Sequence, residues 1–335
     1  MSSQTLPHSM TYIEIAQPGG PEVLKPAQAA LPNLEAGELL IKVHAAGINR
    51  PDLLQRAGQY PMQPGMNPIP GLEVAGEVVA LGPNAQGFKL GDKVCALTNG
   101  GGYAQYCAVP ASQTLMVPAD MDMLSAAAIP ETFFTVWANL FNLGQPVKGD
   151  SVLIHGGTSG IGTTALMLSQ AFNMKAYATA GSAAKCERIR ELGGIPINYH
   201  EEDFAEAIER HTQGQGVQVI LDIMGGPYFE RNVAALARGG RLVIIGFLGS
   251  AKVKEFNLLS ILAKRALVTG SMLRSRTLEE KAEIAQALHS HVWPLLAQGR
   301  CLPIIDQVFD LADAAQAHRR MEEGGHVGKI VLKVV

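Results

Sequence analysis

A glycine-rich turn between two apolar stretches is the clearest chemical signal in the chain. SVLIHGGTSGIGTTALMLSQ (151–170) predicts a strand, a turn and a helix. Glycines in such a turn let the backbone approach a pyrophosphate, which binds the free N–H groups at the start of the helix. We therefore predict dinucleotide binding, with a purely structural turn as the alternative. The predicted binding residues are Gly157, Thr158, Ser159, Gly160, Ile161 and Gly162.

The end of the next predicted strand distinguishes the two nicotinamide dinucleotides. An Asp or Glu there would accept hydrogen bonds from the ribose hydroxyls of NAD. The chain has ATAGSAAKCERIR instead, with no acid between Lys175 and Glu187. Ser182 and Lys185 could bond and neutralise a 2′-phosphate, although Lys185 could also be a solvated helix residue. The missing acid favours NADP(H).

Glu73 places a carboxylate in the apolar, glycine-punctuated run GLEVAGEVV (71–79). Burying a carboxylate is costly unless a partner compensates it. We expect Glu73 to pair with a neighbouring base such as Arg50, or to accept hydrogen bonds from backbone groups and water. The sequence leaves open whether Glu73 is structural or positions a cofactor or substrate.

Metal-binding residues are absent at useful spacings. The four cysteines form no C-x-x-C pair and lie near no histidine at zinc-ligand spacing. His289 and His291 are two positions apart on a predicted helix, so their side chains face apart. We predict no metal site, and reduced thiols in a cytoplasmic protein.

Two different patterns of predicted secondary structure must position these residues. Residues 1–131 alternate short β-like runs with Pro and Gly turns, and from Ser151 strands alternate with helices. Continuously apolar strands such as VILDI predict a doubly wound parallel sheet. YFERNVAALARGG (228–240) is predicted as one of its helices. The first ten residues resemble a flexible leader, over 1–9, and Met10 could be an alternative start.

The totals exclude several classes of protein. The chain has 335 residues, 47% of them hydrophobic, and a net charge of −3. This length predicts two domains. The charge gives no long-range attraction to nucleic acid or an anionic membrane, and no apolar stretch approaches the length of a membrane span. A soluble globular protein is expected.

The layout resembles the medium-chain dehydrogenase/reductase superfamily. Its zinc alcohol dehydrogenases carry a Gly-His-Glu motif, where this chain has Gly71-Leu72-Glu73, and Asn49 stands at the position of a cysteine ligand. The four-cysteine structural zinc lobe is also missing. AAGINRPDLLQRAGQYP, PGLEVAGEVVALG, GGYAQYCAVP and HGGTSGIGTTALMLSQ resemble the zinc-free quinone oxidoreductase family, which includes zeta-crystallin. GSMLRSRTLEEK, with RAGQYP, is most similar to the tumour-suppressor-inducible NADPH quinone oxidoreductase subgroup.

The resemblance implies an α/β fold with a β-rich, GroES-like catalytic domain and a Rossmann domain. We predict the catalytic domain over 1–131, the Rossmann domain over 132–302 and a return to the catalytic domain over 303–335. The implied activity is zinc-independent, NADPH-dependent reduction of quinones, with the acceptor in the interdomain cleft beside the nicotinamide. Alternatives are an NADPH-dependent reductase of α,β-unsaturated carbonyls and a non-catalytic NADPH-binding protein. One-electron and two-electron reduction both stay open.

The resemblance also implies roles for individual residues. Asn49 and Tyr60 would be catalytic, beside the nicotinamide and substrate, although Asn49 could cap a turn and Tyr60 could be a packed aromatic. His326 stands where the subgroup usually has Asn, which puts the cofactor contact of that segment in doubt. Phe247 could instead be a core residue. The implied cofactor-binding residues outside the glycine-rich turn are Thr135, Gly181, Ser182, Lys185, Tyr199, Phe247, Met272, Leu273 and Lys329.

The segment ALVTGSML (266–273) predicts an edge strand. Exposed apolar edges tend to be covered by pairing with another strand, and in this superfamily the edge commonly meets its twin. A homodimer is expected, and whether dimers pair into tetramers stays open.

Overall fold

The computed structural model describes residues 6–60, 62 and 66–335. The chain divides into two compact units, Met1–Phe134 with Arg276–Val335, and Thr135–Ser275. No helix in the described ranges is long and apolar enough to cross a membrane. All four cysteines carry free thiols; the cytoplasmic location stays a prediction.

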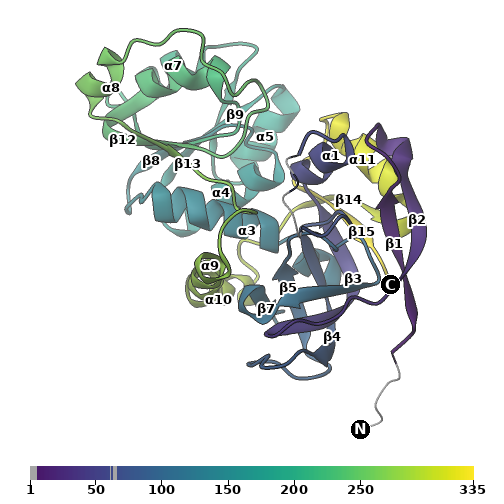
Figure 1. The fold of residues 1–335 in the computed structure, drawn as a ribbon. Coiled ribbons are helices and arrows are strands. Elements are labelled where there is room, and N and C mark those ends of the chain that lie inside the picture. The colour runs from purple at the N-terminus through teal and green to yellow at the C-terminus, as the bar shows by residue number, and fades with distance from the viewer. Residues whose placement is uncertain (1–5, 61, 63–65) are drawn as a thin grey trace. The chain divides into compact units, whose positions relative to one another are not determined.

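The first unit is built on an antiparallel-rich sheet with the strand order β14-β15-β3-β4-β5-β7, and β6 also pairs with β3. A separate hairpin joins β1 (Ser9–Ile15) to β2 (Leu24–Ala30), as Figure 1 shows. The sheet strands are β3 (Glu38–Ile48), β4 (Glu73–Leu81), β5 (Lys93–Leu97), β6 (Tyr106–Pro110), β7 (Thr114–Met116), β14 (Ile305–Asp310) and β15 (Lys329–Lys333).

The last strand of the chain completes this sheet. β15 runs antiparallel to β3, with Ile330 opposite Ile48. This register brings Lys329 beside Asn49, although 280 positions separate them in the sequence. The predicted return of the tail to the first unit is therefore present in the sheet.

Most helices of the first unit are short, but α9 has 14 residues. They are α1 (Arg50–Arg56), α2 (Met123–Ala127), α3 (Pro130–Val136), which reaches the boundary with the second unit, α9 (Leu278–His291), α10 (Trp293–Ala297) and α11 (Ala314–Glu322). Single turns of 3₁₀-helix occur at Pro21–Val23, Ala111–Gln113 and Leu311–Asp313.

The chain returns to the first unit earlier than the sequence suggested. We expected residues 276–302 in the Rossmann domain, but the compact units divide at Ser275. The indole of Trp293 donates to the Met116 carbonyl at 2.6 Å, and Lys281 Nζ donates to Asn99 Oδ1 at 2.8 Å. These contacts are nonlocal, so helical periodicity alone could not assign α9 and α10 to a unit.

The second unit contains a parallel sheet with the order β10-β9-β8-β11-β12-β13. This is the doubly wound Rossmann order, which confirms the predicted fold class. The strands are β8 (Ser151–Ile154), β9 (Lys175–Ala180), β10 (Ile195–Asn198), β11 (Val217–Asp222), β12 (Leu236–Ile244) and β13 (Leu267–Gly270). The helices are α4 (Gly160–Ala171), α5 (Ala183–Glu191), α6 (Phe204–His211), α7 (Gly226–Ala235), α8 (Leu259–Lys264) and a π-helix over Trp137–Leu143.

One helix boundary in this unit was predicted wrongly. The helix expected over 228–240 ends at Ala235, and β12 begins at Leu236. Gly239 has a φ of 78°, which a helix cannot accommodate, and Leu236 pairs with Val217 in the sheet. Sheet pairing therefore overrides the helical pattern of ALARGG.

The beginning of the chain also differs from expectation. Residues 1–5 of the expected flexible leader lie outside the described residues, but Ser9 already begins β1, and Met10 is buried. Met10 as an alternative start stays a prediction.

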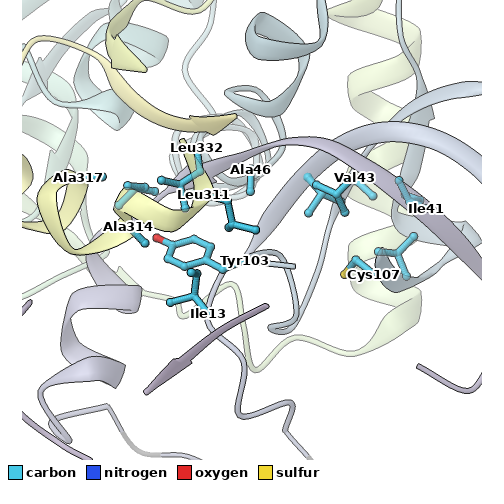
Figure 2. Packing of buried hydrophobic residues seen from close by; sticks show 14 of the residues in the cluster. Ile13, Ile41, Val43, Ala46, Tyr103, Cys107, Leu311, Ala314, Ala317 and Leu332 are labelled. Atoms are coloured by element: carbon cyan, nitrogen blue, oxygen red, sulfur yellow. The ribbon is translucent and has the colours of Figure 1, made fainter. Parts of the chain in front are cut away.

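The core of the first unit packs around Tyr103. Figure 2 shows its ring near Ile13, Leu311 and Ala314, with the hydroxyl directed toward Ala314. Tyr103 is fully buried, so its hydroxyl needs a partner inside the protein.

Candidate functional site

The glycine-rich turn of the second unit forms between a strand and a helix, as the sequence predicts. It lies between β8 and α4 and contains residues 155–159, followed by the first helical turn. The Ser159 hydroxyl caps α4 and accepts a hydrogen bond from Gly162 N–H at 3.0 Å. A Cβ on Gly162 would overlap the Gly156 carbonyl, so this close backbone approach requires glycine. A helix N-terminus of this kind suits an anion, and phosphate binding at the start of α4 stays a prediction.

His155, which was not among the predicted site residues, supports this turn through a shared partner, Thr179. Its imidazole lies 3.2 Å from Thr179 Oγ1 and 2.7 Å from Asn232 Oδ1, while Gly156 N–H donates to the same threonine oxygen at 3.1 Å. Burial lowers the pKa of His155 to about 4, so the ring is neutral at pH 7. The only signal available in the sequence was a histidine directly after a buried strand.

Residues predicted to bind the 2′-phosphate gather after β9 and β10. Ser182 caps α5 by accepting a hydrogen bond from Lys185 N–H at 3.3 Å. Tyr199 is partly exposed, and a Cβ on Gly181 would overlap its hydroxyl. The residues therefore share one patch at the carboxyl edge of the sheet, where dinucleotides bind in this fold. Phosphate recognition by this patch stays a prediction.

Three further predicted residues follow the carboxyl ends of β12 and β13. Phe247 is 57% exposed and Met272 is 65% exposed, whereas Leu273 is buried. Phe247 is therefore not the core residue that the alternative interpretation offered. A Cβ on Gly225 would lie 2.6 Å from its ring, so the ring covers this glycine.

Thr135 and Asp222 are buried. The Thr135 carbonyl accepts a hydrogen bond from Asn139 Nδ2 at 2.8 Å. Asp222, which the sequence analysis missed, ends β11 and accepts from Met224 and Gly225 N–H groups. Burial raises its pKa to about 6. The nicotinamide contact of Thr135 stays a prediction.

The first unit surrounds Glu73 with hydrogen-bond donors. Its Oε1 lies 2.6 Å from Lys329 Nζ and 2.8 Å from Asn49 Nδ2, and Oε2 accepts from the Glu131 backbone N–H at 2.8 Å. Glu73 is fully buried, so these contacts replace its lost hydration. The base expected here, Arg50, is exposed instead. Glu73 does pair with a base and does accept a backbone hydrogen bond, as expected, but the base is Lys329 rather than Arg50. The pairing of β15 with β3, which sequence proximity does not reveal, brings Lys329 there.

Asn49 and Lys329 both use their side-chain polar groups in hydrogen bonds around Glu73. Asn49 is the N-cap residue of α1, its Nδ2 donates to Glu73 and its Oδ1 accepts from Lys329. Lys329 also donates to the Ile48 carbonyl at 2.9 Å. Its three ammonium protons thus match three acceptors. A bond from Lys329 to a cofactor would replace one of these, and that predicted role stays untested.

A second chain of polar contacts supports Asn49 from within the core. Asp52 accepts from Asn49 N–H at 2.8 Å, from Gly71 N–H at 3.1 Å and from the Tyr103 hydroxyl at 3.1 Å. Burial raises the pKa of Asp52 to about 6 against these bonds. The charged cluster of Glu73, Asn49 and Lys329 is therefore supported by the buried carboxyl of Asp52, which bonds both Asn49 and the segment just before β4.

His318 extends this chain to α11. Its Nε2 lies 3.1 Å from Tyr103 Oη, and its Nδ1 lies 3.4 Å from Arg56 Nη1. Burial and the Arg56 charge lower the pKa of His318 to about 3, so the ring is neutral. Arg56 pairs with Glu322 at 2.5 Å. These residues are far apart in the sequence, which gives no sign of their contact.

Glu131 is a further acid that the sequence analysis missed. Glu131 is half-buried and keeps some contact with solvent. Burial, and then the charge of Glu73, raise its pKa to about 8. It is therefore largely a neutral carboxylic acid at pH 7.

Three further residues from the sequence predictions are Tyr60, Leu72 and His326. Tyr60 is partly buried and its N–H donates to the Leu54 carbonyl at 3.2 Å; Pro61, next to it, lies outside the described residues. Leu72 is buried, and His326 is partly buried. Across the described ranges, no group of three His, Cys, Asp or Glu residues is arranged to hold a metal ion.

Known proteins resemble this chain over nearly its whole length. The family described as "Alcohol dehydrogenase GroES-like domain" matches residues 35–119, and "Zinc-binding dehydrogenase" matches residues 194–332. The quinone oxidoreductase of Sus scrofa is 32% identical over 327 residues, covering 96% of this chain and 97% of that protein.

Two solved structures are also similar. A mycobacterial protein in complex with NADPH has a TM-score of 0.84 and 31% identity, covering 97% of this chain and all of that one. The CurK enoyl reductase has a TM-score of 0.83 and 26% identity, covering 98% of this chain and 99% of that one.

Proposed function

Because this chain belongs to the quinone oxidoreductase branch of the medium-chain dehydrogenase/reductase superfamily, we propose that it reduces quinones with NADPH and without zinc. The observation that carries the proposal is the cluster around Glu73. At the two positions where zinc-dependent relatives carry ligands, this chain has the buried Leu72 and an Asn49 amide bonded to Glu73 and Lys329. Neither side chain is a zinc ligand.

NADPH fits the second unit by its own geometry. The glycine-rich turn and the N-terminus of α4 suit a pyrophosphate, and the close approach of Gly162 to Gly156 leaves no room for a larger residue. Ser182 and Lys185 follow β9 without an acid, which suits a 2′-phosphate. The similar mycobacterial structure in complex with NADPH supports this choice. When bound, the cofactor supplies the hydride.

The protein's own residues orient the reactants and stabilise charge. Asn49 is fixed by three neighbours, Glu73, Lys329 and Asp52, so its amide keeps one orientation with little reorganisation. We propose that Tyr60 donates to the oxygen that gains charge. Since no Lewis acid polarises that oxygen, an electron-poor acceptor such as a quinone is favoured. Binding of the acceptor in an interdomain cleft stays a prediction of the resemblance.

Reduction of an α,β-unsaturated carbonyl is the second candidate. The likeness to the CurK enoyl reductase favours it. Hydride addition to the β-carbon leaves an enolate, whose oxygen needs the same donor as a reduced quinone. The cluster around Asn49 serves both reactions.

The test is NADPH oxidation by the purified protein with 1,2-naphthoquinone or an enone as acceptor. Each assay is repeated with NADH and with a chelator. We expect turnover of the quinone, faster with NADPH and indifferent to the chelator. Loss of activity with the chelator would overturn the zinc-free proposal, and turnover of the enone alone would promote the second candidate. A Tyr60→Phe variant with unchanged turnover would exclude the proposed donor.

We also propose that two copies pair through β13. This strand lies at the edge of the parallel sheet, where Leu267 is 52% exposed and Val268 is 37% exposed. Pairing would cover this apolar edge. Light scattering after size exclusion should give a dimer for the wild type and a monomer for Leu267→Asp, whereas a monomeric wild type would refute the pairing.

A further inference from the structure

The proposed reaction needs a proton as well as a hydride. A hydride brings two electrons and one hydrogen nucleus to the quinone, and one oxygen of the product is left as an anion. We propose that the carboxyl group of Glu131 is the general acid that protonates this oxygen. The inference rests on the proposed function and adds a catalytic residue to it.

Glu131 is held directly beside the residues of the charged cluster. It is the second residue of α3, and its backbone N–H donates to Glu73 Oε2 at 2.8 Å. The other oxygen of Glu73 accepts from Asn49 Nδ2 at 2.8 Å. A single carboxylate therefore connects the backbone of Glu131 to the amide that we expect at the hydride end of the site.

The surroundings of Glu131 favour its protonated form. The negative charges of Glu73 on β4 and Asp52 on α1 act against ionisation, and Lys329 on β15 and Lys281 on α9 act in its favour. Both lysines already bond elsewhere, Lys329 to Glu73 and Asn49 and Lys281 to Asn99 at 2.8 Å. Burial is the largest cause and the negative charges add to it, and the resulting pKa of about 8 suits an acid that works near neutral pH.

The other acids of the cluster are less able to deliver a proton. Glu73 and Asp52 are fully buried, and each accepts several hydrogen bonds. Tyr103 is also fully buried, and burial raises its pKa well above 10. Glu131 combines partial exposure with a proton to give.

The proton transfer balances without a further reactant. The O–H bond of Glu131 breaks, its electron pair stays on the carboxylate, and an O–H bond forms on the anionic oxygen of the reduced acceptor. Water then returns a proton to Glu131. An enolate from the second candidate reaction would take its proton in the same way.

The test compares Glu131→Gln with the wild type and with Glu283→Gln, an exposed carboxylate on α9. Glutamine keeps the shape and the backbone bond to Glu73 but cannot release a proton. Turnover of 1,2-naphthoquinone with NADPH is measured from pH 6 to 10, with circular dichroism and NADPH binding as controls for folding. Infrared spectra record the carbonyl band of a protonated carboxyl without any need for turnover.

We expect the wild-type kcat to fall as the pH rises through about 8, because Glu131 then loses its proton. Glu131→Gln should lower kcat about 100-fold at pH 7, a modest effect for general acid catalysis, and remove that descending limb. Its infrared spectrum should lack one protonated-carboxyl band that titrates near pH 8 in the wild type and in Glu283→Gln.

The outcomes separate this inference from the proposed function. If Glu131→Gln turned over as fast as the wild type and with the same pH profile, the role of Glu131 alone would be overturned. The absence of the infrared band from the wild type at pH 7 would overturn it as well. No turnover of either acceptor by the wild type would overturn the proposed function, and the role of Glu131 with it.

Discussion

In the second unit the residues predicted to hold the pyrophosphate follow one another from Gly157 to Gly162, whereas the first unit joins Asn49, Glu73 and Lys329 from three separate elements. The turn needs a strand before it and a helix after it, and its polar groups are backbone N–H groups and a capping hydroxyl. The cluster needs buried side-chain charges that compensate one another.

This difference predicts that substitutions in the two regions have different effects. A change in the turn alters the local backbone and should act mainly on cofactor binding. A change in the cluster leaves a buried charge without its partner, and should therefore act on the stability of the whole first unit. The following experiments examine this contrast, beginning with the largest expected effect.

Replacing Lys329 with Met should be the most damaging change. It leaves the fully buried Glu73 without its cation, and breaking such a pair costs about 3–5 kcal/mol. Urea unfolding measures the loss. Lys333→Met, an exposed lysine on the same strand, is the matched control.

A double variant shows whether the charge or the packing is responsible. Lys329→Met with Glu73→Gln removes both charges, so it should recover part of the stability that the single change loses. A double variant that is less stable than Lys329→Met would contradict the ion-pair explanation.

Replacing Gly162 with Ala should act on the second unit. The added Cβ would overlap the Gly156 carbonyl, and overpacking of this kind costs about 1–3 kcal/mol. We expect weaker NADPH binding in a fluorescence titration, with turnover restored in part by excess NADPH. Gly246→Ala is the control, because its Cβ would meet no atom closer than 3.7 Å. Equal binding by the two variants would argue against the proposed cradle.

Acid should weaken the support of the turn. The folded pKa of His155, about 4, lies below its ordinary value of 6.5, so the unfolded chain binds a proton first as the pH falls. The stabilisation is complete above pH 6.5 and is lost toward pH 4, by about 2 kcal/mol between pH 7 and pH 5. His318 adds a loss of the same sign in the first unit.

Urea unfolding at pH 7 and at pH 5 measures this dependence. His155→Gln should flatten it for the second unit, and the exposed His211→Gln should leave it as in the wild type. A dependence that survives in His155→Gln would assign the effect to other groups.

Lys185→Ala should have the smallest effect. Lys185 is partly buried, and a lysine near the surface bonded to a phosphate contributes about 1 kcal/mol, so NADPH affinity should fall by roughly five- to tenfold. NADH affinity should stay the same, and raised salt should reduce the difference. Lys148→Ala, an exposed lysine of the second unit, is the control. Equal losses for NADPH and NADH would rule out a 2′-phosphate contact.

Much of the second unit could be predicted from the sequence. The apolar strands, the glycine-rich turn and the capping Ser159 depend on neighbours within about twenty residues, and the structure contains the predicted strands in the Rossmann order. The expected helix over 228–240 failed where Leu236 pairs with Val217. That contact is nonlocal, and so was the packing of α9 and α10 that changed the expected unit boundary.

The sequence by itself determined the alternation of strands and helices, the turn from Gly157 to Gly162, and the presence of a carboxylate at Glu73 that needed a partner. Only the tertiary structure decided that this partner is Lys329, that Asp52 and Tyr103 support Asn49, and that burial beside Glu73 raises the pKa of Glu131. The physical reason is that helix and turn formation depend on backbone geometry a few residues apart. A buried charge depends on whatever the fold brings within hydrogen-bonding distance, here strand β15 from the end of the chain.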